Sequence, residues 1–348
     1  RGHADVRRGP TVSVPALDRL LDRHADAAAG FSGVVAVEAV GGHGAFDRRT
    51  VGLADRAHGI EMTVGHRIGV ASGTKTLTAL AVLSCLDDGL LDLHQPIRPL
   101  LGDDLPLVDD RVTVDMLLRH RSGIGDYLDE NVDDHDPLAY TMRLPLHTLD
   151  GADGYARAID GHPQQFEPDS GFAYCNSGYV LLAILVERVT GGTFDAAVER
   201  RVCRPAGLRD TGFERMDSLP GTCAVGYAEA VGLRTNVLHL PVIGFGDGGV
   251  FTSVADVHRL WRAMIDGPLT GSFVRMRTGH PDDGRYGMGL WLDDDTGAVW
   301  MEGMDVGASF RSTWSPASGR IVTVMSNTTR GAWPVDRALR DEVFRATS

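Results

Sequence analysis

The chain has 348 residues, of which 43% are hydrophobic, and a formal net charge of -13. This length can bury a large core and form two domains, or one domain with an inserted lobe. The acidic balance argues against a nucleic acid partner, which requires clustered positive charge, and no apolar run approaches the roughly 20 residues that span a membrane.

The N-terminal part of the chain carries signals for one helix and a pair of strands. No basic region followed by an apolar run opens the chain, which slightly favours a cytoplasmic protein over a secreted one whose signal has been removed. Residues 14–28 place leucines on one side and charges on the other, as a surface helix does. Residues 33–40 are rich in valine, glycines follow, and residues 49–53 can pair back, so we expect a hairpin.

The middle of the chain has mostly helical patterns. Residues 74–87 are good helix formers and apolar on nearly every side, which predicts a helix buried inside the protein. Further helical patterns cover residues 114–119, 179–189 and 194–202, with loops rich in glycine and proline between them.

Strand patterns return near the C-terminus. Residues 299–303, 310–314 and 320–326 read as strands, and residues 335–346 as a final helix. Because strand-forming segments lie at both ends of the chain, we expect an α+β fold in which helices flank an antiparallel sheet. Residues 1–75 and 240–348 would form the sheet-containing domain and residues 76–239 an inserted, mainly helical domain. The active site would lie in the cleft between the two.

The choice of basic residues singles out one position. Of the 34 basic residues, 33 are arginine, and the single lysine is Lys75. Arginine cannot deprotonate in a protein, whereas a buried amine can shift its pKa toward neutrality and act as a base. We therefore expect that Lys75 occupies a position where a base is needed.

Ser72 and Lys75 lie three residues apart at the start of the predicted buried helix, where such side chains share a face. The amine can therefore reach the hydroxyl. The positive field of the helix N-terminus favours the alkoxide and keeps the lysine pKa low. We predict that Ser72 is a nucleophile and that Lys75 is the base that activates it.

A second candidate group is the tripeptide Tyr174-Cys175-Asn176, which precedes another apolar helix. A phenol beside a lysine can relay a proton to a leaving group, provided that Lys75 lowers the tyrosine pKa from its usual value near 10. Asn176 could hold the lysine amine and a substrate amide together.

Together these motifs resemble the serine β-lactamase and penicillin-binding protein superfamily, which carries Ser-x-x-Lys and two further motifs. The closer resemblance is to its class C β-lactamase and DD-peptidase branch, whose second motif is Tyr-x-Asn. Four more segments are similar to that branch: residues 117–123 to its Leu-Leu-x-His-x-Ser-Gly turn, 204–211 to its Pro-Leu-Gly-Met and Asp-Thr segment, 248–256 to its Gly-Gly helix entry, and 286–289 to its Tyr-Gly-x-Gly. We interpret His120 as a structural residue of its turn.

The third motif departs from the family pattern. The resemblance places Met301-Glu302-Gly303 where relatives carry His-x-Gly or Lys-Thr-Gly, whose basic residue helps to hold a substrate carboxylate. Gly303 still allows the strand to approach a ligand, and the Met304 N–H could join the Ser72 N–H as an oxyanion hole. We expect Glu302 to favour a neutral or amine-bearing acyl substrate over a β-lactam.

The resemblance thus implies a serine hydrolase that acts on an ester or amide through a Ser72 acyl-enzyme, as a carboxylesterase, peptidase or amidase, with weak β-lactam reactivity at most. Two alternatives use the same fold: an acyltransferase or transpeptidase, and a ligand-binding or sensor module without turnover. The partner would be a small-molecule ester, amide or peptide, and the oligomeric state is open. No cofactor or metal is expected, and the four widely spaced cysteines are predicted to be free thiols.

Overall fold

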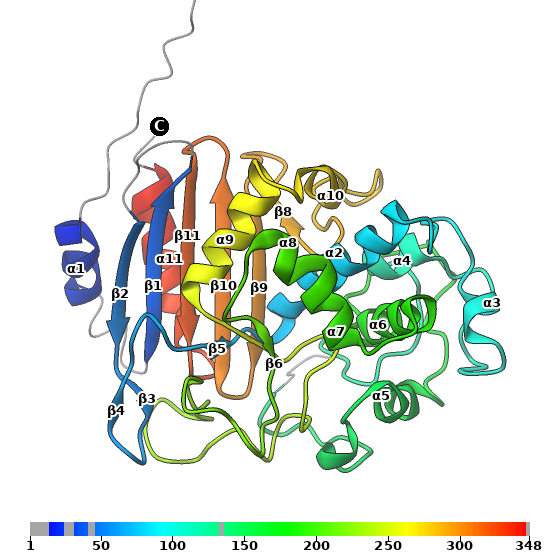
Figure 1. Cartoon of the computed structure of the whole chain (residues 1–348), viewed down its shortest axis with the longest axis horizontal. Helices are drawn as coiled ribbons and strands as arrows, with labels where there is room; N and C mark the ends of the chain where they lie inside the picture. The colour runs from blue at the N-terminus through cyan, green and yellow to red at the C-terminus, as the bar shows by residue number, and fades with distance from the viewer. Residues whose placement is uncertain (1–13, 24–30, 41–45, 132–135, 346–348) are drawn as a thin grey trace, which may run out of the picture.

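The computed structural model describes residues 14–23, 31–40, 46–131 and 136–345. Its main feature is one six-stranded antiparallel sheet with the strand order β2-β1-β11-β10-β9-β8 (Figure 1). The strands are β1 (Gly33–Ala39), β2 (Phe46–Val51), β8 (Trp291–Leu292), β9 (Val299–Asp305), β10 (Ala308–Ser315) and β11 (Arg320–Ser326). Val35 of β1 pairs with Val324 of β11, so strands from the two ends of the chain meet at the centre of the sheet. The predicted α+β class is confirmed.

Helices cover both faces of this sheet. Alternate residues of β1 and β11, such as Val35 and Val324, pack with α1 (Val14–Arg23) and α11 (Ala332–Arg345). Their neighbours Val34 and Met325 belong to the main core, which includes α9 (Val254–Ile265) on the opposite face (Figure 1). Because both faces are covered, β11 is buried throughout and shows no alternation of polar and apolar residues.

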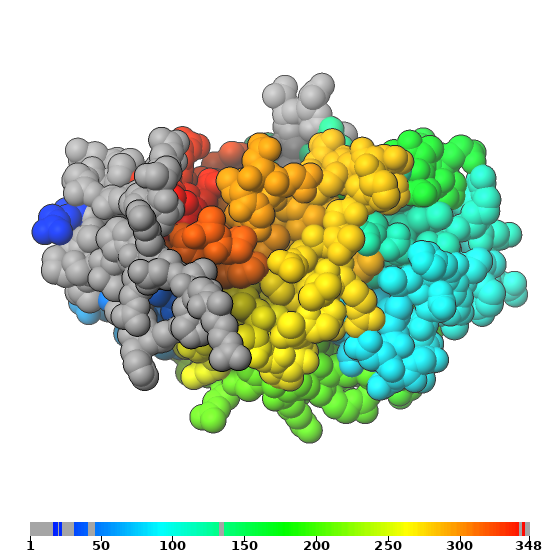
Figure 2. All heavy atoms as spheres, turned by 90° about the horizontal axis from the view of Figure 1, so that it is seen from above, coloured from blue at the N-terminus to red at the C-terminus, as the bar shows by residue number. Residues whose placement is uncertain are grey.

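The remaining helices gather beside the β8 edge of the sheet (Figure 1). The longest are α2 (Thr74–Asp87), whose bounds match the prediction, and α6 (Asn176–Thr190), and both are buried over most of their length. The others are α3 (Arg98–Leu101), α4 (Val114–Leu118), α5 (Ala152–Ile159), α7 (Phe194–Val198), α8 (Arg204–Ala206) and α10 (Thr270–Met276). Seen from above, the segment around α9 and α10, in yellow, lies between the C-terminal strands and the cyan residues that follow α2 (Figure 2).

Several predicted bounds differ from the observed ones. The N-terminal helix is described over Val14–Arg23, and the rest of its predicted range lies outside the described residues. The helix predicted over residues 194–202 is α7 followed by a π-helical turn, Glu199–Cys203. The return strand of the first hairpin begins at Phe46, earlier than predicted.

Two small sheets have no counterpart in the prediction. One joins β3 (Leu53–Asp55) to β4 (Ile60–Glu61), and the other has the order β5-β7-β6, with β5 (Ile68–Gly69), β6 (Gly212–Phe213) and β7 (Val250–Thr252). Strands of two or three residues are too short to show a periodic pattern. The second sheet matters for the site, because β5 leads directly to Ser72. The two-domain division stays a prediction, and β6 lies within the predicted insertion while pairing with β7.

The four cysteines are free and buried, as predicted. None of the helices in the described ranges combines the length and the apolar character needed to cross a membrane.

Candidate active site

Ser72 lies in a tight turn between β5 and α2. The turn, Ala71–Gly73, is a single 3-10 segment. The backbone φ of Ala71 is 45°, which residues other than glycine seldom adopt. Thr74 fixes this turn, because its hydroxyl donates to the Ala71 carbonyl at 2.8 Å and accepts from the Val250 N–H at 3.0 Å. The Ser72 side chain is thereby held at the wall of a pocket.

Lys75 is buried and has three hydrogen-bond acceptors. Its Nζ lies 2.9 Å from Ser72 Oγ, 2.7 Å from Asn176 Oδ1 and 2.8 Å from the Asp247 carbonyl oxygen. Burial lowers the pKa of Lys75, while the charges of Asp247 and Glu130 oppose this effect. A lowered pKa makes the neutral amine accessible, and the neutral amine can remove the Ser72 proton.

This burial predicts a pH dependence for covalent labelling of Ser72. Only neutral Lys75 is a base, so the rate of labelling by a fluorophosphonate should fall as pH drops through the Lys75 pKa and level off above it. Because burial lowers that pKa, the midpoint should lie below the ordinary lysine value of 10.5. The rate would be followed by intact mass spectrometry, with circular dichroism confirming the fold at each pH. A midpoint at or above 10.5 would contradict the assignment.

The ring of Tyr174 lies against Lys75, with Nζ 4.9 Å from the ring centroid. The pKa of Tyr174 is raised well above its ordinary value by burial and by the Glu130 charge, although a hydrogen bond to the Ser72 side chain lowers it. The expected lowering of this pKa by Lys75 is therefore not observed, because burial of the phenol is the largest influence on it. A protonated phenol can still donate a proton to a leaving group.

His120 holds the segment that carries Tyr174. Its Nδ1 accepts from the Cys175 N–H at 3.0 Å, its carbonyl accepts from the Ala173 N–H at 3.0 Å, and its ring centroid lies 4.3 Å from that of Tyr174. Burial lowers the pKa of His120 far below its ordinary value, so its ring stays neutral. These contacts match the structural role predicted for this histidine.

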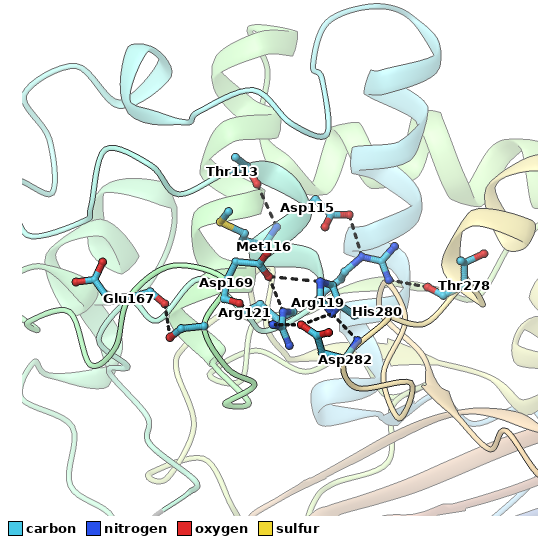
Figure 3. A network of polar contacts seen from close by, with 11 residues as sticks. Thr113, Asp115, Met116, Arg119, Arg121, Glu167, Asp169, Thr278, His280 and Asp282 are labelled. Atoms are coloured by element: carbon cyan, nitrogen blue, oxygen red, sulfur yellow. Dashed lines mark hydrogen bonds and ion pairs between the residues drawn. The ribbon is translucent and has the colours of Figure 1, made fainter.

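Arg119 and Arg121, the neighbours of His120 in the sequence, anchor its turn, and Figure 3 shows their polar contacts. Arg121 donates from Nε to Asp169 Oδ1 at 2.6 Å, and the Asp169 N–H returns a bond to the Arg121 carbonyl. Arg119 donates to Asp115 at 2.9 Å and to the Thr278 carbonyl at 2.6 Å. The turn is therefore tied both to the segment that leads to the second motif and to the residues after α10 (Figure 3).

Asn176 is the first residue of α6 and contacts Lys75 through Oδ1. Its Nδ2 donates to the Leu128 carbonyl at 2.9 Å and to Glu130 Oε1 at 2.8 Å. The structure thus places Asn176 where it can hold the lysine, as predicted. Both amide hydrogens are used within the protein, so in this arrangement Asn176 offers none to a substrate amide.

The third motif brings β9 against the Ser72 turn. A Cβ atom at Gly303 would lie 2.2 Å from the Val70 carbonyl oxygen and 2.5 Å from the Ser72 nitrogen, so no larger residue fits without displacing the turn. Met301 points into the core, where it is 3% exposed, and Met304 lines the pocket beside Ser72. The role of the Met304 N–H as an oxyanion donor stays a prediction.

Glu302 is not a free carboxylate beside the site. It accepts from Trp300 Nε1 at 3.1 Å and forms an ion pair with Arg311 at 3.1 Å, its partner across β9 and β10. Burial raises the pKa of Glu302, and the Arg311 charge opposes this. Glu302 lines the space beside Ser72 and Arg311 compensates its charge, while its effect on substrate preference stays a prediction.

Acidic side chains gather in the pocket whose wall holds Ser72, which the sequence analysis missed. Glu130, Glu214, Asp247 and Asp305 line this acidic pocket, together with apolar residues such as Met142 and Phe251. Burial raises the pKa of Asp247, and it raises the pKa of Asp305 to about 7. Asp247 belongs to a glycine-rich turn, residues 244–249, and Asp305 directly follows Met304, but neither position marks a site by its residue type.

Within the described ranges, no group of three or more His, Cys, Asp or Glu side chains is arranged to hold a metal ion.

Known proteins resemble this chain in sequence and in fold. Residues 17–345 match the sequence model of the Beta-lactamase family. Esterase EstB of Burkholderia gladioli is 38% identical over 186 residues, which cover 52% of this chain and 47% of the esterase. A D-aminopeptidase of Brucella ovis is 26% identical over 286 residues, which cover 80% of this chain and 49% of the peptidase. The matches thus span about half the length of these two relatives.

The solved structures agree with this result. The crystal structure of a penicillin binding protein from Bacillus halodurans superposes with a TM-score of 0.84 and 31% sequence identity, covering 94% of this chain and 99% of that chain. A match of fold and sequence over nearly the whole length shows that this chain belongs to the Beta-lactamase family, within the serine β-lactamase and penicillin-binding protein superfamily.

Proposed function

We propose that this protein is a serine hydrolase that cleaves an ester or amide through an acyl-enzyme on Ser72. The observation that carries the proposal is the buried amine of Lys75, 2.9 Å from Ser72 Oγ and fixed by two further acceptors. Such a pair of nucleophile and base, each oriented by its neighbours, is what acyl transfer requires.

The reaction would follow two steps. Ser72 Oγ bonds to the substrate carbonyl carbon while Lys75 takes its proton, and the N–H groups of Ser72 and Met304 stabilise the oxyanion. The bond to the leaving group then breaks, and Tyr174 gives that group a proton that Lys75 restores to the phenol. In the second step, Lys75 takes a proton from the water that attacks the ester carbonyl and passes it to Ser72 Oγ, which leaves as the free hydroxyl as the carboxylic acid departs.

The charge distribution favours an ester or amide over a β-lactam. Within the described ranges, two cationic side chains lie at the pocket walls or beside Ser72, namely Lys75 and Arg311. Each of them has acidic neighbours. Four acidic side chains line the acidic pocket, which suits a neutral or amine-bearing acyl group better than an anionic one. The names of the relatives, an esterase and a D-aminopeptidase, support this choice. Within the superfamily, we assign the chain to the class C branch.

A comparison of three substrates tests the proposal. We expect turnover of a p-nitrophenyl ester and of an amino acid anilide, with kcat/KM at least about a hundredfold above that for the β-lactam nitrocefin, because a charge without its partner costs about 2–5 kcal/mol. The Ser72→Ala variant should turn over none of them. Nitrocefin turnover equal to that of the ester would refute the substrate assignment.

The same experiment separates the two alternative functions. An amine or alcohol added as a second acceptor would intercept the acyl-enzyme of a transferase and yield the acylated acceptor as the main product. An adduct on Ser72 that forms and never hydrolyses would instead indicate a binding or sensor module.

A further inference from the structure

Four planar side chains form a ladder that begins beside Ser72. The ring centroids of Tyr174 and Trp291 lie 6.0 Å apart with planes inclined by 8°, and those of Trp291 and Trp300 lie 6.3 Å apart at 11°. The Arg311 guanidinium carbon lies 4.5 Å from the Trp300 centroid. These distances are typical of offset stacking. We call these four residues the aromatic ladder.

The ladder is built on the sheet, which makes it rigid. Trp291 on β8 and Trp300 on β9 are direct cross-strand partners, and Arg311 on β10 is paired with Glu302 of β9. Cross-strand pairs of this kind stabilise a sheet and fix the orientation of their side chains. Tyr174 joins the ladder from outside the sheet.

The aromatic ladder borders a separate pocket next to Ser72, which we call the aromatic space. This space measures about 970 Å³, a volume that includes open solvent, and its wall includes Tyr174, Trp291, Arg311 and Trp333. The acidic pocket lies beside it and shares Ser72, Glu130 and Met304 with it. Tyr174 lines the aromatic space and is absent from the lining of the acidic pocket.

The position of Tyr174 decides which part of a substrate each space receives. The group that protonates the leaving atom must be within hydrogen-bond reach of it. A leaving group on its way out therefore lies on the Tyr174 side of Ser72, and the acyl group extends into the acidic pocket. Glu302 and Arg311 compensate one another, and the remaining charged side chain of the wall is Glu130, at the border with the acidic pocket. Away from that border, the aromatic space offers flat apolar surface.

We propose that the space beside the aromatic ladder is the leaving-group subsite and that it selects flat, uncharged leaving groups such as aryl alcohols and aryl amines. The proposal rests on the serine hydrolase function proposed above. Trp333, at the start of α11, is the specificity residue that can be changed most cleanly, because it lines this space without belonging to the ladder that holds Tyr174.

The test compares phenyl and methyl esters of one acyl group, so that both form the same acyl-enzyme. In Trp333→Ala, we expect the ratio of kcat/KM for the phenyl ester to that for the methyl ester to fall about tenfold, the size of effect of lost apolar contacts in a pocket. The deacylation rate constant should not change, because the leaving group has departed by then. Trp333→Phe keeps a flat apolar ring and should retain most of the ratio.

A matched variant changes the other side of the site. Met142 lines the acidic pocket and is absent from the lining of the aromatic space, so Met142→Ala should alter both esters by the same factor and leave their ratio unchanged. An unchanged ratio in Trp333→Ala, or a changed ratio in Met142→Ala, would overturn the assignment. So would a Trp333→Ala effect confined to deacylation.

A second readout does not depend on turnover. Equilibrium dialysis of the Ser72→Ala protein with 4-nitroaniline, an uncharged aryl amine, should show saturable binding that the added Trp333→Ala change weakens about tenfold and Met142→Ala leaves intact. Equal binding by all three proteins would overturn the subsite. Labelling of the wild-type protein by a fluorophosphonate reports separately on Ser72, so failure of the hydrolase proposal is recognised independently.

Discussion

Replacing Lys75 by arginine is expected to slow acylation of Ser72 by about 10²–10⁴-fold, the contribution of a positioned general base. The change keeps the positive charge and removes the ability to deprotonate, because the guanidinium does not titrate in a protein. The measurement is the rate at which a fluorophosphonate adduct appears in the intact mass. Ser72→Ala should gain no adduct.

The control for this experiment makes the reverse exchange at the surface. Arg204, whose side chain is 72% exposed and paired with Glu199, can be changed to lysine, and labelling should proceed at the wild-type rate. Because a guanidinium is larger than the buried amine that it replaces, Lys75→Met serves as a second variant and should show a comparable loss. Labelling of Lys75→Arg at the wild-type rate would exclude Lys75 as the base, and a folded wild type that never labels would favour the sensor module.

Gly303→Ala is expected to lower kcat/KM by about 10²–10³-fold, as the loss of one oxyanion donor does. The added methyl group would lie 2.2 Å from the Val70 carbonyl oxygen and 2.5 Å from the Ser72 nitrogen, so either β9 or the Ser72 turn must move. The same overlap should destabilise the fold by about 1–3 kcal/mol, as overpacking commonly does. Ester kinetics and denaturant unfolding measure the two effects.

Gly271 supplies the matched glycine control. It lies in α10, and a Cβ atom there would meet nothing within 4 Å. Gly271→Ala should therefore keep wild-type kinetics and be as stable as the wild type or slightly more stable, because alanine favours a helix over glycine. If Gly303→Ala behaved in the same way, the close contact between β9 and the nucleophile turn would not be needed for activity.

The features that sequence predicted well are those with local signals. The sequence pattern predicts both ends of the helix Thr74–Asp87 correctly, because its apolar character on every side ends abruptly at Asp88 and Gly89. The central strands followed from runs of β-branched residues at both ends of the chain. The Ser72 and Lys75 pair follows from their spacing together with the position of the single lysine at the start of a buried helix.

The missed features depend on contacts between distant segments. Asp247 binds Lys75 through its backbone carbonyl. Every residue has this group, so the residue type at position 247 does not indicate the contact. The ion pair between Glu302 and Arg311 requires the register of β9 and β10. The pKa of Tyr174 was predicted in the wrong direction, because a cation near a ring does not offset burial of the hydroxyl.

Because Lys75 is the single lysine, a lysine-specific protease has one cleavage site in this chain. Cleavage after Lys75 must break the peptide bond to Thr76 within the buried helix α2, where both residues are 1% exposed. A folded molecule hides this bond, and an opened one presents it, so the yield of two fragments counts the molecules in which α2 has come apart. The residue assigned here to catalysis thus doubles as a built-in reporter of the conformational stability of the helix that carries it.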